Sequence, residues 1–210
     1  MTAPGDRPPP SPLDLLGDRR AFVDAGLGPV AFVTANALAG LQTAAYVAIG
    51  VSVLLTAERL ARRKPAINAV GGLFGTGLAV FIALRTGDAE GYFVPRMLYA
   101  AALGLVLVGS VVVRQPLIGV FVALLFKVPP GWRRHPGARR ASSEVTLAWA
   151  GLFGLRAGVY AILIAAGSVG GLAAASVVMG IPAFALLLFL SYRYFPRRLT
   201  QLGAPVPHVR

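Results

Sequence analysis

Cysteine is absent from this sequence of 210 residues, which excludes disulfides, thiol nucleophiles and cysteine metal sites. Histidine is scarce as well, and neither His135 nor His208 has a second histidine or a carboxylate at ligand spacing. No serine has a histidine and an acid within its own segment, so serine hydrolysis has no support. We therefore expect no metal and no cofactor, and no residue is predicted to be catalytic.

Acidic residues are also few, with eight Asp and Glu against twenty Lys and Arg, for a formal net charge of +12. Charged residues make up 13% of the chain and hydrophobic residues 56%, whereas an ordinary soluble domain has roughly 25% charged residues. The basic residues lie in short loops beside apolar stretches, where they favour a membrane topology over nucleic-acid binding. We expect membrane lipids as partners, with anionic headgroups at the cytoplasmic face and no nucleic acid. A second copy of the chain or another membrane protein stays open as a further partner.

Long stretches without charge divide the chain into candidate membrane helices. Residues 28–57 form an uncharged stretch of about 30 residues, which is too long for one span and short for two. Basic residues flank both ends, which favours two crossings with a turn near Gly40 and a short first helix over 29–39. Further spans are expected over 66–84, 97–113, 145–166 and 172–192.

Glycine, proline and one short apolar segment interrupt this pattern. The apolar stretch between Pro116 and Lys127 has about 11 residues, too few to cross the membrane, and is expected to be re-entrant or interfacial. GSVGG at 167–171 predicts an uncharged hairpin, and Pro182 is expected to kink the last span. The predicted fold class is therefore all-α: a polytopic membrane helical bundle of about six transmembrane helices with one short re-entrant or interfacial segment.

The terminal segments differ from the apolar middle of the chain. Residues 1–26 are expected to be a disordered, proline-rich cytoplasmic tail, with a surface helix over 13–24. Residues 27–192 form the predicted transmembrane bundle, and residues 193–210 a cytoplasmic basic tail. With both termini inside, seventeen of the twenty Lys and Arg face the cytoplasm, which is a strong positive-inside pattern. We therefore expect a multi-pass protein of the cell membrane with both termini cytoplasmic.

Glycines recur at a spacing typical of packed membrane helices. Gly71 and Gly75 form one G-x-x-x-G pattern, and Gly154 and Gly158 form another. Small residues at this spacing let helix backbones approach closely in lipid. We expect these four glycines to contribute to helix packing.

One arginine lies inside a predicted span. Arg156 is the single charge in residues 145–166 and falls near their middle. A guanidinium at the middle of the bilayer is unfavourable by at least about 2.5–3.5 kcal/mol. Glu144 is 12 residues earlier, roughly 18 Å along the same helix, so it is too far away to pair with Arg156 directly.

Two interpretations of Arg156 stay open. It could bind an anion such as a lipid phosphate, an isoprenoid diphosphate or a small solute, because guanidinium stays protonated and offers five donors. Alternatively, it could hold the bundle together by donating to backbone carbonyls and neutral polar side chains. The candidate residues for this intramembrane site are Arg156, Asn36, Gln42, Asn68, Tyr99 and Tyr160.

An acidic pair occurs in a loop predicted to face outside. Asp88 and Glu90 stand two residues apart in RTGDAEGYF. Paired carboxylates can bind a cation or share acid and base chemistry, but a solvated turn after Gly87 explains the pair as well. Membrane prenyltransferases that act on diphosphates need aspartate-rich motifs on two loops, and this chain has one thin acidic loop.

The order of these segments carries a resemblance to a known family. The segments are GLFGTGLAVFIALRTGDAEGYFVP, VVVRQPLIG, a tryptophan-arginine loop and LFGLRAGVY. Over about residues 15–195 the chain resembles an uncharacterised actinobacterial family of multi-pass membrane proteins, known as a domain of unknown function. Over about residues 65–125 it is more distantly similar to intracellular septation protein A, an inner-membrane protein linked to the cell envelope. The resemblance implies a polytopic membrane fold, and neither family supplies a catalytic residue.

Three functions follow from these observations. The first is a non-enzymatic membrane protein associated with the envelope or accessory to a transport system. The second is a small transporter or channel that uses Arg156 for an anionic or amphipathic solute. The third is a membrane enzyme acting on an isoprenoid or lipid substrate, which lacks the buried acid that such chemistry needs.

Overall fold

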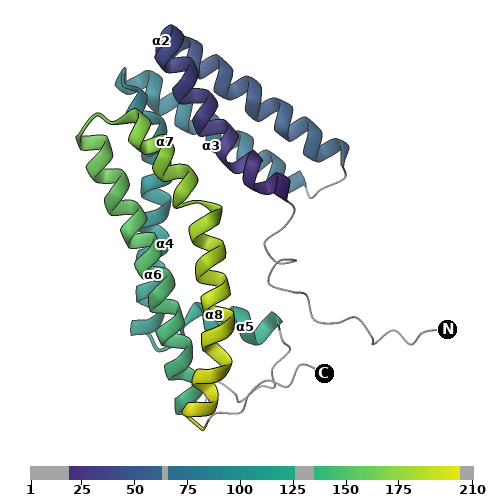
Figure 1. The fold of residues 1–210 in the computed structure, drawn as a ribbon, viewed down its shortest axis with the longest axis vertical. Coiled ribbons are helices and arrows are strands. Elements are labelled where there is room, and N and C mark those ends of the chain that lie inside the picture. The colour runs from purple at the N-terminus through teal and green to yellow at the C-terminus, as the bar shows by residue number, and fades with distance from the viewer. Residues whose placement is uncertain (1–18, 63–65, 126–134, 204–210) are drawn as a thin grey trace, which may run out of the picture. The chain divides into compact units, whose positions relative to one another are not determined.

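The computed structural model describes residues 19–62, 66–125 and 135–203. Within these ranges the chain is helical and contains no strand, which confirms the predicted all-α class. The elements, in chain order, are α2 (Arg19–Ala61), α3 (Ala66–Thr86), the 3-10 helix η1 (Ala89–Phe93), α4 (Val94–Val112), α5 (Leu117–Leu125), α6 (Pro136–Ala165), α7 (Val169–Val178) and α8 (Ile181–Gln201) (Figure 1).

The described residues form two compact units. The first unit consists of residues 103–125, 135–152 and 184–203, and the second of residues 19–62, 66–102 and 153–183. Helices α2, α3, η1 and α7 therefore belong to the second unit and α5 to the first, whereas α4, α6 and α8 contribute residues to both.

Four helices of the described chain are long and apolar enough to cross a membrane. Their bounds are Leu27–Ala61, Ala89–Val112, Pro136–Ala165 and Val169–Gln201, and a shorter apolar helix covers Val70–Thr86. Helix α5 has nine residues, so it is too short to cross, as the sequence predicted. Its re-entrant or interfacial position stays a prediction.

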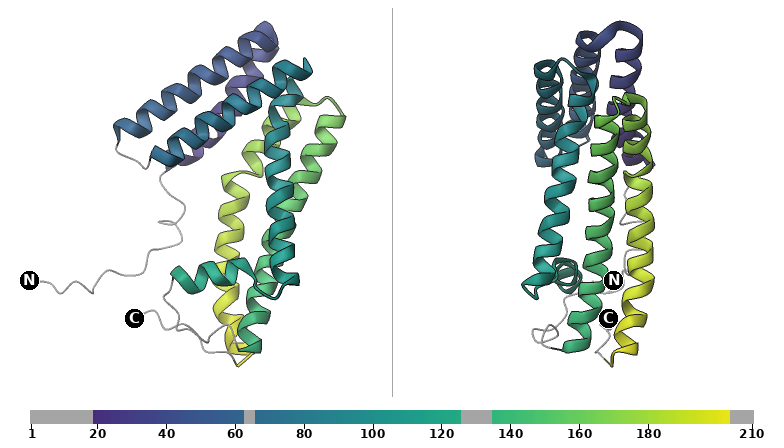
Figure 2. Two further views of the ribbon diagram at one scale, coloured as in Figure 1. Left: turned by 180° about the vertical axis from the view of Figure 1, so that it is seen from behind. Right: turned by 90° about the vertical axis from the view of Figure 1, so that its left-hand side faces the viewer.

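Gly40 divides α2 into two arms, 19–39 and 41–61. Its φ of 79° and ψ of 175° form a combination that is essentially restricted to glycine. The arms lie side by side in Figures 1 and 2. This confirms the turn predicted near Gly40.

The first arm of α2 is longer than predicted. It begins at Arg19 and continues through Pro29, whereas the sequence placed the start of this helix at Pro29. The apolar stretch marks where a span can lie but does not mark where a helix begins, because charged residues are good helix formers too. Residues 19–24 of the predicted surface helix are thus part of α2, and its residues 13–18 lie outside the described chain.

A short turn joins α6 to α7, as the GSVGG sequence predicted. Gly167 has a φ of 64°, the left-handed conformation that commonly ends a helix. The N–H of Ser168 donates to the Leu163 carbonyl and that of Gly167 to the Ile164 carbonyl, both at 3.0 Å. These two bonds are those of a Schellman cap, and they reverse the chain without a charged residue.

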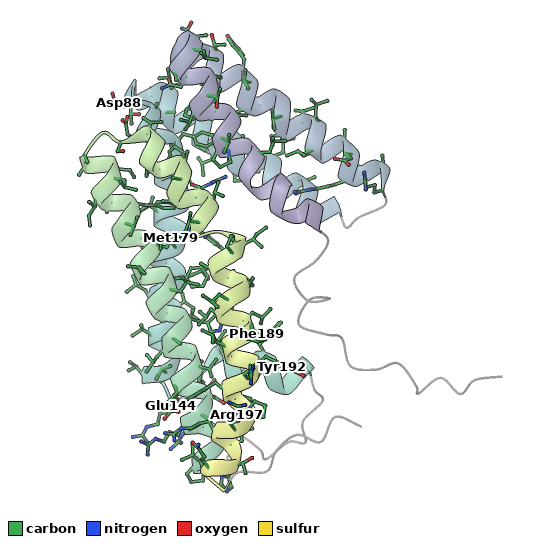
Figure 3. All side chains as sticks on the ribbon, viewed as in Figure 1. Asp88, Glu144, Met179, Phe189, Tyr192 and Arg197 are labelled. Atoms are coloured by element: carbon green, nitrogen blue, oxygen red, sulfur yellow. The ribbon has the colours of Figure 1, made fainter. Side chains whose placement is uncertain are left out.

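The last predicted span is broken into α7 and α8. Helix α7 ends at Val178, α8 begins at Ile181, and Met179 marks the break in Figure 3. Pro182 has no N–H to donate to the Val178 carbonyl, and its ring crowds that carbonyl. The interruption therefore occurs where the proline was expected to kink the span, while the helical segment begins at Val169, before the predicted start at residue 172.

Aromatic rings form the centre of the second unit. Phe32 and Tyr92 stack with ring centroids 4.1 Å apart, and Phe93 meets Tyr92 edge to face at 5.2 Å. All three side chains are buried. Gly91 lets η1 approach α3 closely, since a Cβ there would lie 3.0 Å from the Cα of Ala83. This cluster joins the first arm of α2 to η1.

Helices α6 and α8 pack against each other in the first unit. Trp149 meets Phe184 edge to face with ring centroids 4.6 Å apart. Its indole N–H donates to the Ser191 hydroxyl oxygen at 3.1 Å. Trp149 therefore fixes the register between the two helices.

Candidate functional site

Arg156 lies in α6, within the part of this helix that belongs to the second unit. One N–H of its guanidinium, on Nη2, donates to the hydroxyl oxygen of Tyr160 at 3.3 Å. The guanidinium carbon also lies 5.5 Å from the centroid of the Tyr160 ring. Because Tyr160 follows four residues later, the two side chains meet on one face of the helix.

Tyr160 connects Arg156 to α7. Its side chain is fully buried, and its hydroxyl lies 3.0 Å from the hydroxyl of Ser176. The Ser176 hydroxyl donates its hydrogen to the Leu172 carbonyl at 2.8 Å, so it must accept the hydrogen of Tyr160. The hydrogen bonds therefore run in one direction, from Arg156 through Tyr160 and Ser176 to Leu172.

Most N–H groups of the Arg156 guanidinium have no hydrogen-bond acceptor among the described residues. A guanidinium has five N–H groups, and the bond to Tyr160 uses one of them. The Nε atom is buried and has no hydrogen-bond partner in the described part of the chain. Buried donors normally have partners, so each exception calls for an explanation such as a bound ligand or ion.

The charge of Arg156 is also unpaired among the described residues. The ion pairs there join Arg62 to Glu58, and Arg140 and Arg198 to Glu144. Neither Glu58 nor Glu144, the carboxylates of these ion pairs, forms an ion pair with Arg156. The arrangement is therefore a cation held by one neutral hydroxyl, with donors free for an anionic group.

A second polar cluster lies at one end of the first unit. The carboxylate of Glu144 accepts hydrogen bonds from Arg198 at 2.8 and 2.9 Å, from Tyr194 at 2.8 Å and from Arg140 at 3.3 Å. Glu144 directly precedes the apolar stretch 145–166. The hydrogen bonds from the Arg198 guanidinium and, to a smaller extent, from the Tyr194 hydroxyl lower the pKa of its carboxyl to about 2. The cluster joins α6 to α8, and each oxygen of the Glu144 carboxylate accepts two hydrogen bonds within it.

The acidic pair of the α3–α4 connection is not gathered with further metal ligands. Asp88 is exposed, and Thr86 Oγ1 accepts its backbone N–H at 3.4 Å (Figure 3). Glu90 is half-buried beside the α6–α7 turn, where an added Cβ at Gly167 would lie 3.7 Å from its Oε1. No group of three or more His, Asp or Glu occurs in the ranges that the structure describes. A role of the pair in binding or proton transfer stays a prediction.

The four glycines of the G-x-x-x-G patterns face open space. Gly71, Gly75, Gly154 and Gly158 are exposed, and a Cβ added at any of them would meet no other atom within 4 Å. Their contribution to helix packing stays a prediction.

Residues 16–201 match the model of a family described as protein of unknown function (DUF3159). The chain belongs to the DUF3159 family. No curated protein and no solved structure shows significant similarity to it. The match supports the resemblance to a family known as a domain of unknown function, while the actinobacterial distribution and the likeness to septation protein A stay predictions.

In this DUF3159 chain, one of the predicted partners bonds to Arg156. Tyr160 does so, whereas Asn36, Gln42 and Tyr99 make no hydrogen bond to it, and Tyr99 is 65% exposed. The side chain of Asn68 lies outside the described set. Ser176 was missed, because its contact with Tyr160 depends on the register between α6 and α7, for which the sequence carries no signal.

Proposed function

We propose that this DUF3159 protein is a small, non-enzymatic transporter of the cell membrane that binds the anionic group of an amphipathic or small solute at Arg156. The observation that carries the proposal is a guanidinium without an ion pair, whose Nε has no hydrogen-bond partner among the residues that the structure describes. Of the three functions that the sequence raised, this is the second.

The proposed topology has six spans. They are the two arms of α2, then α3, α4 and α6, and finally α7 with α8 as one interrupted span. Both termini and residues 58–64 and 114–144 lie in the cytoplasm, which places seventeen of the twenty Lys and Arg there. Arg156 then lies near the middle of the bilayer.

A site at this depth favours transport. Desolvation of an anionic group is most unfavourable at the middle of the hydrocarbon core, and a fixed cation offsets part of it. Transporters typically bind their substrates near this level, beside membrane helices that are interrupted. Ser176, the third residue of the hydrogen-bond chain from Arg156, lies on α7 shortly before the break at Met179 and Gly180. The arginine and the broken helix are therefore linked.

Reporter fusions test the topology. A reporter at Ala89, in η1, is expected to be active on the outer side, and one at Ala138, in the first turn of α6, on the cytoplasmic side. Paired fusions with compartment-specific reporters at each position measure this. If both positions report the same side, the six-span topology is wrong.

Native mass spectrometry tests the anion site. The protein purified from its own membrane is expected to retain an anionic amphipath, and Arg156→Gln is expected to lower its occupancy about tenfold or more because a charged hydrogen bond is lost. Arg156→Lys keeps the charge but not the planar fork, so it is expected to retain part of the ligand.

Arg85→Gln is the matched control, because Arg85 belongs to the same unit, is exposed and lies at the end of α3. It is expected to leave the occupancy unchanged. Equal occupancy in Arg156→Gln and the unmodified protein would refute the anion site. An equal loss in Arg85→Gln would show a general effect of charge instead.

A further inference from the structure

A cavity of about 200 Å³ lies in the first unit, where the α4–α5 turn and the start of α5 meet the beginning of α6. It is smaller than the roughly 300–1,000 Å³ of common small-molecule sites, so it suits a headgroup or a small ion. The residues that line it are Arg114, Gln115, Pro116, Gly119, Val120, Arg139 and Ser142.

Arg114 has an unusual backbone conformation. Its φ is 59°, and no other described residue apart from glycine has a positive φ. The N–H of Arg114 donates to the Val111 carbonyl at 2.9 Å, and that of Gln115 to the Ser110 carbonyl at 2.8 Å. These bonds make Arg114 the left-handed residue of a Schellman cap, a position that glycine usually takes. Elsewhere in the described chain, the residues that take positive φ are the glycines Gly40, Gly87, Gly167 and Gly203.

An arginine in a left-handed conformation suggests that its side chain is needed there. Strained non-glycine residues persist where the surrounding structure holds them, and they cluster at ligand sites. The turn itself would form at least as easily with glycine. The arginine therefore adds nothing to the turn and adds a cation to the cavity.

Both arginines of the cavity lack an ion-pair partner in the described chain. Glu144 is the acid of the first unit that the structure describes, and Arg140 and Arg198 already occupy it. The side chains of Arg114 and Arg139 make no ion pair among those described. Two arginines without an ion pair in the described chain line one small cavity, and they give it a positive potential that attracts an anion.

The first turn of α5 brings backbone N–H groups to the cavity, which Gly119 and Val120 line. A Cβ at Gly119 would overlap the Ser142 side chain, so glycine is needed for the first turn of α5 to lie against α6 (Figure 2). Ser110 Oγ accepts the N–H of Leu117 at 3.3 Å. Of the following N–H groups, that of Val120 donates to the Pro116 carbonyl at 3.1 Å, whereas those of Ile118 and Gly119 come before the first bonds within the helix. Backbone donors beside two arginines are the arrangement that binds phosphate oxygens.

We propose that this cavity binds a phosphate group, carried either by an anionic phospholipid or by a free phosphate ion, through Arg114 and Arg139. Under the proposed topology it lies on the cytoplasmic side, at the level of lipid headgroups. The site does not depend on Arg156, so the two proposals can fail separately.

Thermal unfolding of delipidated protein tests the site. One set of samples is in nanodiscs of phosphatidylcholine with and without phosphatidylglycerol, and another in phosphatidylcholine nanodiscs with and without inorganic phosphate. Phosphatidylglycerol is expected to raise the melting temperature, because a ligand that binds the folded state stabilises it. A rise with phosphatidylglycerol alone assigns the site to a lipid headgroup, and a rise with inorganic phosphate assigns it to the free ion.

Arg114→Gly separates binding from folding. The ligand-free variant is expected to melt about 2–4 °C higher than the unmodified protein, because glycine relieves the strain. It should nevertheless bind the phosphate probe about 10–100-fold more weakly, because a charged hydrogen bond is lost. Arg139→Gln is expected to weaken binding by a similar factor.

Arg197→Gln is the control, since Arg197 is exposed on α8 of the same unit, does not line the cavity, and loses the same charge (Figure 3). It is expected to keep the ligand-induced rise. The proposal is wrong if Arg114→Gly and Arg139→Gln weaken binding no more than Arg197→Gln does. It is also wrong if neither phosphatidylglycerol nor inorganic phosphate raises the melting temperature of the unmodified protein.

Discussion

Replacing Arg156 by leucine is expected to stabilise the ligand-free protein by up to about 2 kcal/mol. A guanidinium near the middle of the bilayer costs at least about 2.5–3.5 kcal/mol. Its hydrogen bond to the Tyr160 hydroxyl, the one it makes among the described residues, has a charged donor and returns about 1.5–3 kcal/mol, and leucine removes both terms. Under the proposed topology, we infer that a bound anion accounts for a charge kept at this cost, since no carboxylate in the described ranges pairs with it.

The measurement is thermal unfolding of lipid-stripped protein, followed by tryptophan fluorescence, with Arg156→Lys beside Arg156→Leu. The lysine variant keeps the charge on α6, so it is expected to melt at or below the temperature of the unmodified protein. A lower melting temperature for Arg156→Leu would mean that Arg156 holds the helices together. The Arg156 anion site would then lose its main argument.

Tyr92→Ala is expected to destabilise the second unit by about 3 kcal/mol or more. The ring is 1% exposed, stacks on Phe32 at 4.1 Å and meets Phe93 at 5.2 Å. Truncating a large buried aromatic side chain usually costs about 3–5 kcal/mol, because a cavity remains where the ring packed. The lower end applies here, since transfer between a protein interior and lipid contributes little.

Tyr99→Ala is the control for this variant, because it deletes the same atoms from a side chain that is 65% exposed on α4. It is expected to change the stability by about 0.5 kcal/mol or less. Thermal unfolding together with hydrogen exchange of α2 measures both effects. Equal losses in the two variants would show that the ring cluster does not hold the unit together.

Chain reversals were the most predictable part of the fold. The uncharged stretch 28–57 was too long for one span, and Gly40 was the residue in its middle that allows a turn. Pro182 marked the interruption between α7 and α8 because a proline cannot continue the hydrogen-bond ladder. Both signals are local, since they depend on the backbone chemistry of one residue.

Helix ends were less predictable. Helix α6 begins at Pro136, nine residues before the apolar stretch that predicted it, and α2 begins ten residues before Pro29. Hydropathy reports where a helix can lie in lipid, and the polar turns that extend it leave no signal of that kind. The apolar stretch therefore predicts only the part of each helix that can lie in lipid, and the helix itself begins before that part.

The sequence could predict Arg156 and its partner Tyr160 on the same helix, but not the residues that other helices bring to these sites. Arg156 stood out because it is a charge in an apolar stretch, and Tyr160 follows at helical spacing. Ser176 and the pair of Arg114 with Arg139 depend on contacts between helices, which need the register of the packed structure. The conformation of Arg114 could not be foreseen, because arginine rarely takes a positive φ.

The turns at Gly40 and Gly167 have a consequence for how the chain enters the membrane during synthesis. Neither turn contains an ionisable residue, and each joins two apolar helical segments. The adjoining segments can therefore insert together as a helical hairpin, without carrying a charge at the turn through the hydrocarbon core. A charged substitution in either turn would act during biogenesis, as slower insertion by the translocon, even where the mature fold could accommodate the side chain.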